Sequence, residues 1–190
     1  MTNLPENLIQ ALNNELRNGE ILVWAEQPIP SQLVKSAYWL WLFFIPWTLF
    51  ALFWTAGASG FQWPTLDNIG VYSLFPLFGL PFILIGVYGL VMPFKMRKKA
   101  ESTVYAITNY RLLIGHFPNA IELQIFFPKD VNRLTRLEKS DGSGNLIFSN
   151  HAYLDSDGGK NTTKEGFYAV RDVKKVELLV EAFLKTNQVI

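Results

Sequence analysis

Two long apolar runs decide the fold of this chain. Residues 37–58 read AYWLWLFFIPWTLFALFWTAGA, and residues 71–94 read VYSLFPLFGLPFILIGVYGLVMPF. Between positions 36 and 94 only Asp67 carries a formal charge. As α-helices the runs would be roughly 33 and 36 Å long, enough for a hydrocarbon core of about 30 Å. Because these helices would be apolar on every side, we expect two membrane spans, joined by a loop at 59–70, rather than the buried hairpin of a soluble protein.

Basic residues predict how the spans are oriented. The second run ends in a basic segment, which comprises Lys95, Arg97, Lys98 and Lys99, whereas the loop at 59–70 has no Lys or Arg. Under the positive-inside rule both termini then lie in the cytoplasm. We expect the basic segment to contact anionic lipid of the inner leaflet, with about 1 kcal/mol from each charge. The expected organisation is a cytoplasmic segment at 1–35, a transmembrane hairpin at 36–94 and a cytoplasmic domain at 95–190.

Composition narrows the classes of function. The chain has 190 residues, a net charge of +1 and no cysteine. The lack of cysteine excludes disulfides, thiolate metal sites and a cysteine nucleophile. The nearly balanced charge argues against a nucleic-acid-binding protein, which would carry a concentrated basic stripe.

The first 35 residues predict an amphipathic helix followed by a short strand. Apolar residues recur at helical spacing (Leu4, Leu8, Ile9, Leu12 and Leu16), and Asn18-Gly19 provides a stop. Residues 20–28 then resemble a strand that a proline ends. The polar face of the helix is rich in Asn and Glu rather than Lys, which favours docking on the cytoplasmic domain over lying on the membrane. The sequence leaves open whether residues 21–27 pair into the sheet of that domain.

Beyond residue 99 the pattern changes to the two-residue alternation of strands. Residues 103–107 and 111–114 flank the turn Thr108-Asn109-Tyr110 and predict a β-hairpin. Further strands are expected at 121–127, 130–139, 145–149, 151–154 and 166–171, with a polar loop at 155–165. The chain ends in an amphipathic helix capped by Asp172. The expected fold class is α+β, with a bent antiparallel sheet of about seven strands capped by a C-terminal helix, which is the pleckstrin-homology (PH) layout.

One motif carries a family resemblance. The residues Thr103-x-Tyr105-x-Ile107-Thr108-Asn109-x-Arg111-Leu112-Leu113 resemble the opening hairpin of the bacterial PH-like family, whose members often carry Y-x-I-T-(D/N)-x-R directly after a two-span hairpin. The segments 19–28 and 141–148 also look like that family. The resemblance implies a PH-like protein of the bacterial inner (cytoplasmic) membrane. It implies no catalytic residue and no phosphoinositide site, and Tyr110 stands where the family often has a basic residue.

The motif residues Tyr105, Thr108, Asn109 and Arg111 are expected to have structural roles. Thr and Asn side chains satisfy the backbone groups of turns, and Asn tolerates the left-handed conformation that turns use. Arg111 is expected to bridge to a strand end or to a carboxylate.

No catalytic or metal-binding group stands out elsewhere. His116 and His151 are the only histidines, and they fall on different expected strands without a metal-ligand spacing. A calcium loop counted from Asp155 would need Gly at its sixth position and Glu at its twelfth, where the chain has Lys160 and Gly166. We therefore expect no enzyme activity, no metal and no cofactor.

These observations favour a membrane-anchored binding or scaffolding module. Its expected partners are the lipid bilayer and either a protein partner or a second copy of the chain, and the sequence identifies no small-molecule ligand. The alternative is a subunit of an oligomeric channel or transporter, because two spans can line a pore after oligomerisation. Neither run contains an ionisable residue, whereas ion pathways usually do.

Overall fold

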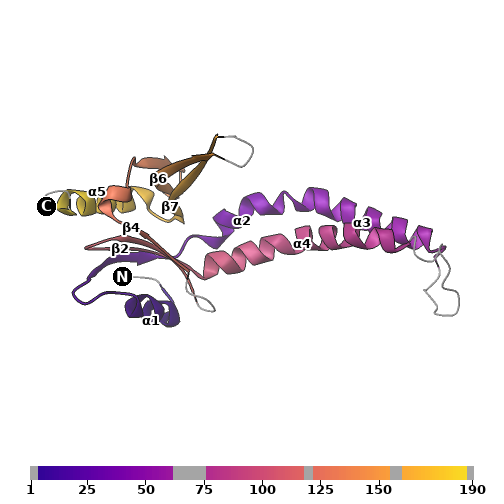
Figure 1. Cartoon of the computed structure of the whole chain (residues 1–190), viewed down its shortest axis with the longest axis horizontal. Coiled ribbons are helices and arrows are strands. Elements are labelled where there is room, and N and C mark those ends of the chain that lie inside the picture. The colour runs from indigo at the N-terminus through magenta and orange to yellow at the C-terminus, as the bar shows by residue number, and fades with distance from the viewer. Residues whose placement is uncertain (1–3, 62–75, 118–121, 155–159, 188–190) are drawn as a thin grey trace. The chain divides into compact units, whose positions relative to one another are not determined.

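The chain forms two compact units. The computed structural model describes residues 4–61, 76–117, 122–154 and 160–187. One unit, the sheet domain, comprises Met1–Leu33 and Lys98–Ile190, and the other, the hairpin unit, comprises Val34–Arg97. The sheet domain is therefore assembled from both sides of the hairpin unit, as the colours in Figure 1 show.

Two of the helices in the described residues are long and apolar enough to cross a membrane. These are α3 (Trp41–Ala58) and α4 (Leu80–Glu101), and the apolar stretch around α4 starts at Pro76. A separate helix α2 (Pro30–Tyr38) precedes α3, so the first apolar helix begins later than the expected span at 37–58. Residues 71–75 of the second expected span lie outside the described residues. With 18 residues, α3 is about 27 Å long.

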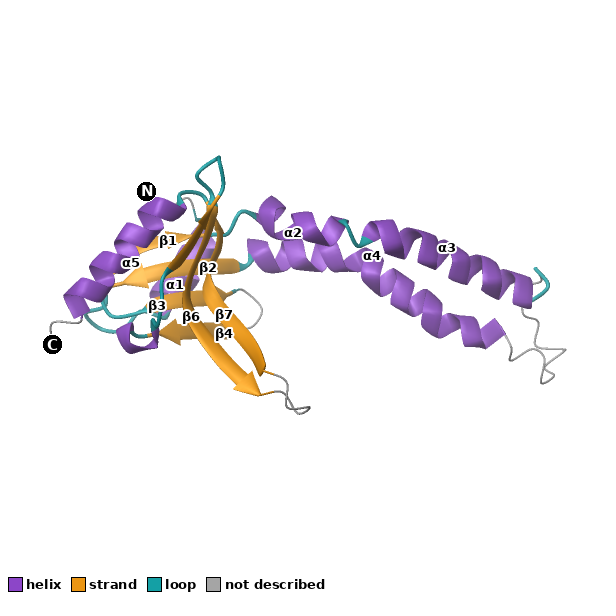
Figure 2. Cartoon of the chain, turned by 90° about the horizontal axis from the view of Figure 1, so that it is seen from above, coloured by secondary structure: helices purple, strands orange, loops and turns teal. Residues whose placement is uncertain are grey.

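The two apolar helices run side by side (Figure 2). They pack closely at glycines of α4. A Cβ atom at Gly86 would lie 2.3 Å from Thr48 Oγ1, and one at Gly89 would lie 2.3 Å from Phe44 Cγ. A larger residue has no room at either place, which is how small residues let helices approach each other in membranes. The Trp41 indole N–H also donates a hydrogen bond to the carbonyl of Leu90 over 3.1 Å.

The sheet domain is α+β, with two antiparallel sheets. The first sheet has the order β1 (Leu22–Glu26), β2 (Thr103–Thr108), β3 (Leu112–His116) and β4 (Glu122–Phe126). The second has the order β5 (Thr135–Glu138), β6 (Gly144–Leu154) and β7 (Lys160–Val170). Helix α5 (Val173–Asn187) ends the described chain, and the Asp172 carboxylate accepts the Lys175 N–H as the predicted cap. In place of one bent sheet of about seven strands, the domain has a four-stranded and a three-stranded sheet.

Residues 22–26 belong to the first sheet, which answers the question that the sequence left open. β1 pairs antiparallel with β2, with Ala25 opposite Ala106 and Glu26 opposite Tyr105. The first sheet thus joins a strand from before the hairpin unit to three strands from after it.

Both faces of the four-stranded sheet are covered. Side chains alternate along a strand, so Val104 and Ala106 of β2 pack in the cluster that contains α1 (Glu6–Asn14), while Tyr105 and Ile107 pack in the cluster that contains α5. Figure 1 shows α1 and α5 on opposite sides of this sheet. All six residues of β2 are consequently buried, and the amphipathic helix α1 docks on the domain.

Phe167 of β7 joins the two sheets in the core. Its ring centroid lies 5.6 Å from that of Trp24 in β1, 5.0 Å from that of Tyr105 in β2 and 5.1 Å from that of Phe148 in β6. Side-chain contacts of this kind are worth about 0.5–1.5 kcal/mol per pair beyond the burial of apolar area.

The second sheet differs from its expected strands. β6 runs without the break expected near residue 150, and β7 begins at Lys160, inside the expected polar loop. A short 3₁₀ turn, η3 (Pro128–Asp130), ends at the first residue of the segment expected as a strand at 130–139, and β5 occupies only four residues of that segment. The strand at 160–165 escaped prediction because the residues KNTTKE alternate no apolar side chains.

A strained bulge interrupts β7. Gly144 pairs with Val170 and Leu146 pairs with Phe167, so two residues of β7 face Asn145. One of them, Ala169, has a φ of 54°, in the left-handed region. The Ala169 N–H donates a hydrogen bond to the side-chain oxygen of Asn145 over 2.8 Å. The Ala169 carbonyl accepts the N–H of Ile29 at 2.8 Å. For a residue with a Cβ this conformation costs about 1–2 kcal/mol.

We predict that Ala169→Gly is better tolerated than the matched change Ala106→Gly. Both alanines are buried, but only Ala169 gains from the left-handed freedom of glycine. The expected difference in the free energy of unfolding is about 1–2 kcal/mol in favour of Ala169→Gly. It is measured by urea titration of the detergent-solubilised chain. Equal losses in the two variants would show that Ala169 is not strained.

Candidate functional site

The basic segment lies on the last turns of α4, where all four of its side chains are exposed. Lys95, Lys98 and Lys99 are three and four positions apart, so they share one face of the helix. The Nζ atom of Lys95 lies 4.9 Å from the centroid of the Tyr88 ring, a cation–π contact. Positive charges here also complement the negative end of the helix dipole. Contact of this segment with anionic lipid stays a prediction.

The turn between β2 and β3 is closed by Thr108. Its N–H donates to the carbonyl of Arg111 over 3.0 Å. Its hydroxyl oxygen accepts the N–H groups of Tyr110 and Arg111, at 3.2 and 3.0 Å. A single threonine side chain thus satisfies two backbone donors of the turn.

Asn109, the next residue of the motif, connects this turn to two distant segments. Its side-chain oxygen accepts the Ile21 N–H at 2.8 Å, just before β1 begins. Its own N–H donates to the Ile21 carbonyl over 3.1 Å. At the end of α5, the Asn187 side-chain amide donates to the Asn109 carbonyl over 3.2 Å.

Arg111 forms a buried ion pair with Glu20. Its Nε donates to Glu20 Oε1 over 2.8 Å and its Nη2 donates to Oε2 over 2.9 Å, with side chains 3% and 0% exposed. Arg111 Nη2 also donates to the carbonyl of Glu15 over 2.9 Å. The Glu20 carboxylate accepts two further hydrogen bonds, from the Thr108 hydroxyl at 2.8 Å and the Arg17 N–H at 2.9 Å. The bidentate geometry and these extra bonds offset the cost of burying two charges.

The pKa of the Glu20 carboxyl reflects the same environment. Burial by itself raises the pKa, but the hydrogen bonds from Arg111, from the Arg17 N–H and from the Thr108 hydroxyl outweigh burial. The net result is a pKa below its ordinary value of 4.5. Glu20 is therefore ionised at neutral pH and has no proton to supply to a reaction.

Tyr105, the remaining motif residue, lies in the core of the sheet domain. Only 4% of it is exposed, and burial raises the pKa of its phenol to about 12. The hydroxyl therefore stays protonated at neutral pH. Its position against Phe167 makes it part of the packing between the two sheets.

The basic segment and the motif turn are not one site. Lys99 precedes β2 and Thr108 ends it, so the length of the strand, roughly 17 Å, separates them. The side chains of Thr108 and Arg111 bind Glu20, and that of Asn109 binds the Ile21 N–H, so these three motif residues connect segments within the sheet domain. The basic segment is the better candidate for contact with an external partner.

A second set of contacts, which we call the root contacts, fixes the chain where it leaves and re-enters the sheet domain. The Gln27 side chain, after β1, donates to the carbonyl of Glu101, before β2. Gln32 donates to the Ser143 hydroxyl over 2.7 Å and accepts from Lys139 Nζ at 2.6 Å. These contacts tie the beginning of α2 to the turn between β5 and β6.

His116 belongs to no metal site formed by the described residues. The Nδ1 atom of His116 lies 2.9 Å from the Thr103 hydroxyl. Burial, and then the charge of Lys99, lower the pKa of the His116 imidazole, while Glu122 acts in the opposite direction. Among the described residues no three His, Asp or Glu side chains gather as metal ligands. The side chain of His151 and residues 155–159 of the calcium loop that we considered lie outside the described residues.

Sequence reasoning missed Glu20 and the root contacts. Glu20 stands in the segment that resembles the PH-like family, but nothing in its neighbourhood shows that its partner is 91 positions away. A single acidic residue before a strand and a single arginine after a turn are common. Only the pairing of β1 with β2 brings the two together.

Comparisons with known proteins add no relative. No protein-family model, no curated protein and no solved structure matches the chain.

We predict that Glu20→Gln destabilises the sheet domain by about 3 kcal/mol, because it leaves the Arg111 charge buried without its partner. Glu15→Gln is the matched control, since only the carbonyl of Glu15 contacts Arg111. The measurement is the free energy of unfolding of the detergent-solubilised chain. An equal effect of the two substitutions would contradict the role of the ion pair.

The same variant tests the pH dependence. The Glu20 carboxyl has a lower pKa in the folded state than in the unfolded state. As the pH falls, the carboxyl is therefore protonated in the unfolded state before it is protonated in the folded state. The stabilisation is therefore complete above about pH 4.5 and is lost as the pH falls through the folded pKa. This loss should be reduced in Glu20→Gln and should persist in Glu15→Gln.

Proposed function

We propose that the chain is a non-catalytic, membrane-anchored binding or scaffolding module of the PH-like type, at the inner leaflet of the bacterial cytoplasmic membrane. One observation carries the proposal: the two candidate spans are inserted between β1 and β2, which are neighbours in one sheet. A domain whose sheet begins before the spans and continues after them stays at the bilayer surface once the spans are inserted.

The order of the elements supports the PH-like assignment. Four antiparallel strands in sequence order are followed by three more and then by a helix that packs on the core. The antiparallel pairing and the C-terminal helix agree with what the sequence resemblance leads us to expect, but the strands form two sheets instead of the single bent sheet that we expected. The motif residues at the turn between β2 and β3 hold that layout together.

The surface of the hairpin unit supports a membrane setting. Large apolar side chains project outward along both helices, with Phe50 66%, Phe53 68% and Leu84 68% exposed. Soluble proteins rarely leave such extended apolar surface in water, whereas a bilayer covers it. The two helices that are long and apolar enough to span a membrane, α3 and α4, thus also expose large apolar side chains.

The mechanism of such a module is spatial. Anchoring raises the effective concentration of the sheet domain toward other molecules at the membrane. The basic segment adds attraction to anionic lipid, about 1 kcal/mol for each charge near the surface. A protein partner or a second copy of the chain would then bind an exposed part of the sheet domain.

Site-specific photo-crosslinking in native membranes tests the binding function. A photoreactive amino acid replaces Tyr110, Leu137 or Leu178 of the sheet domain, which are 52%, 53% and 58% exposed. We expect a discrete protein adduct, either with another protein or with a second copy, from at least one position. The same amino acid at Leu49, which is 63% exposed on α3, is the control for contacts within the membrane. Failure of all three positions to give an adduct would contradict the proposal.

Two further measurements accompany this test. In liposomes the full chain should conduct no more ions than protein-free vesicles, and a protein-dependent conductance would favour a channel subunit instead.

Since the chain has no cysteine, Lys174→Cys provides a single thiol on α5 for a test of membrane orientation. A membrane-impermeant maleimide should label it only from the cytoplasmic side.

A further inference from the structure

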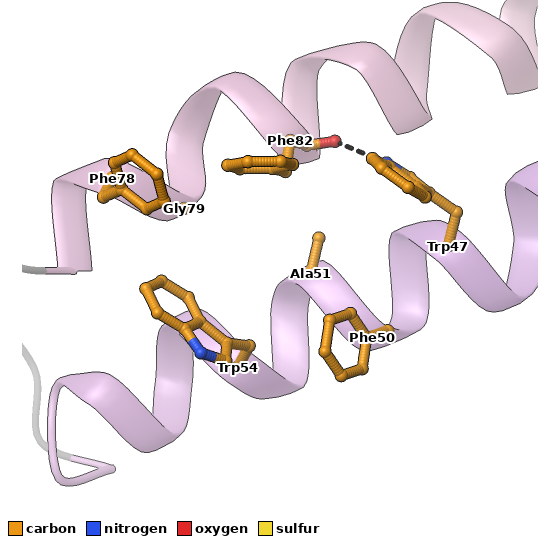
Figure 3. Close-up of a pocket in the computed structure, with 7 residues that line it drawn as sticks. All are labelled: Trp47, Phe50, Ala51, Trp54, Phe78, Gly79 and Phe82. Atoms are coloured by element: carbon orange, nitrogen blue, oxygen red, sulfur yellow. Dashed lines mark hydrogen bonds between the residues drawn. The ribbon is translucent and has the colours of Figure 1, made fainter.

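The hairpin unit contains an apolar cavity between α3 and α4 (Figure 3). Its volume is about 280 Å³. Among the described residues, its lining consists of Trp47, Phe50, Ala51 and Trp54 from α3, with Phe78, Gly79 and Phe82 from the beginning of α4 and the turn before it.

Four aromatic rings line the cavity in a row of neighbouring pairs, and the cavity is open on one side. The ring centroids of Trp47 and Phe82 are 6.0 Å apart, those of Phe82 and Phe78 are 5.4 Å apart, and those of Phe78 and Trp54 are 6.1 Å apart. Figure 3 shows the methyl group of Ala51 pointing toward α4 between the two tryptophans. The space exists because this central position of α3 holds a small residue.

The helices meet again at one end of the cavity. A Cβ atom at Gly79 would lie 1.9 Å from Thr55 Oγ1, so the backbone at Gly79 packs directly against the side chain of Thr55. The cavity is therefore a defined widening between close contacts at Gly79 and Gly86, and not a general separation of the helices.

The chemistry of the wall selects an apolar ligand. The lining side chains are rings and a methyl group, and the Trp47 indole N–H already donates to the Phe82 carbonyl over 3.1 Å. No formal charge occurs at positions 36–66 or 68–94. A ligand with a charged or hydrogen-bonding group would lose its hydration here without compensation, whereas a hydrocarbon would lose nothing.

The size of the cavity fits part of a lipid chain. An apolar cavity of about 150 Å³ stays dry and binds benzene, so one of nearly twice that volume accommodates a longer hydrocarbon. In a bilayer the medium around α3 and α4 is itself hydrocarbon.

We propose that this cavity binds the hydrocarbon chain of a membrane lipid and retains that lipid on the hairpin unit. The proposal rests on the membrane setting proposed above, and it adds a site that the binding function of the sheet domain does not require. The polar head of the lipid lies outside the cavity.

The test is native mass spectrometry of the full chain after reconstitution in phosphatidylglycerol vesicles and extraction into detergent. We expect one lipid molecule to remain bound per chain. Ala51→Trp fills the cavity and should lower the lipid-bound fraction at least five-fold. The matched control is Leu49→Trp, which adds the same side chain at a position that is 63% exposed, and it should retain the lipid.

Further arms keep the outcomes distinct. Ala51→Leu, a smaller change, should give an intermediate loss, and circular dichroism checks that each variant keeps its helices. No retained lipid in the unmodified chain, or equal retention in Ala51→Trp, overturns the proposal. A lipid-free dimer that Ala51→Trp abolishes also overturns it, because a second copy then fills the cavity. Flotation of the reconstituted chain with the vesicles shows separately whether the membrane setting itself holds.

Discussion

The pairing of β1 with β2 is the constraint on which the rest of the structure depends. The chain leaves the sheet after Glu26, forms α2, α3 and α4, and returns at Thr103 to the strand next to the one it left. Closing so long a segment costs entropy, and the cost is small only if the segment brings its own ends together. The antiparallel helices α3 and α4 bring the ends of the segment together, because α4 runs back alongside α3 and reaches the point where α3 begins.

Contacts at both ends of the strand pair secure it. At one end, the Glu20 carboxylate binds Arg111 and Thr108, and Asn109 binds Ile21. At the other end, Gln27 binds the carbonyl of Glu101. The motif residues Thr108, Asn109 and Arg111 thus stabilise one end of this strand pair. These three residues form their hydrogen bonds within the sheet domain.

Local signals in the sequence predict the parts of this structure that depend on local interactions. The apolar runs, the alternation in β2 and β3 and the apolar stripe and cap of α5 all lie within short stretches, and each gives the expected type of element. The membership of β1 in the sheet could not be predicted, because its partner lies beyond the hairpin unit. Glu20 escaped notice for the same reason. The polar half of β7 and the bulge at Ala169 depend on β6, and no local pattern reports them.

The most direct test of this account is a disulfide across β1 and β2. Ala25→Cys with Ala106→Cys places thiols at paired, buried positions of the cysteine-free chain, whereas Ala25→Cys with Val104→Cys places them on the same face but diagonally, about 7–8 Å apart. A protease site inserted after Asp67 then allows the oxidised chain to be cut in the loop. The account predicts that residues 1–67 and 68–190 stay linked on a denaturing, non-reducing gel for the first pair only. Separation of the halves for that pair, or equal linkage for both pairs, would contradict a sheet built from both sides of the hairpin.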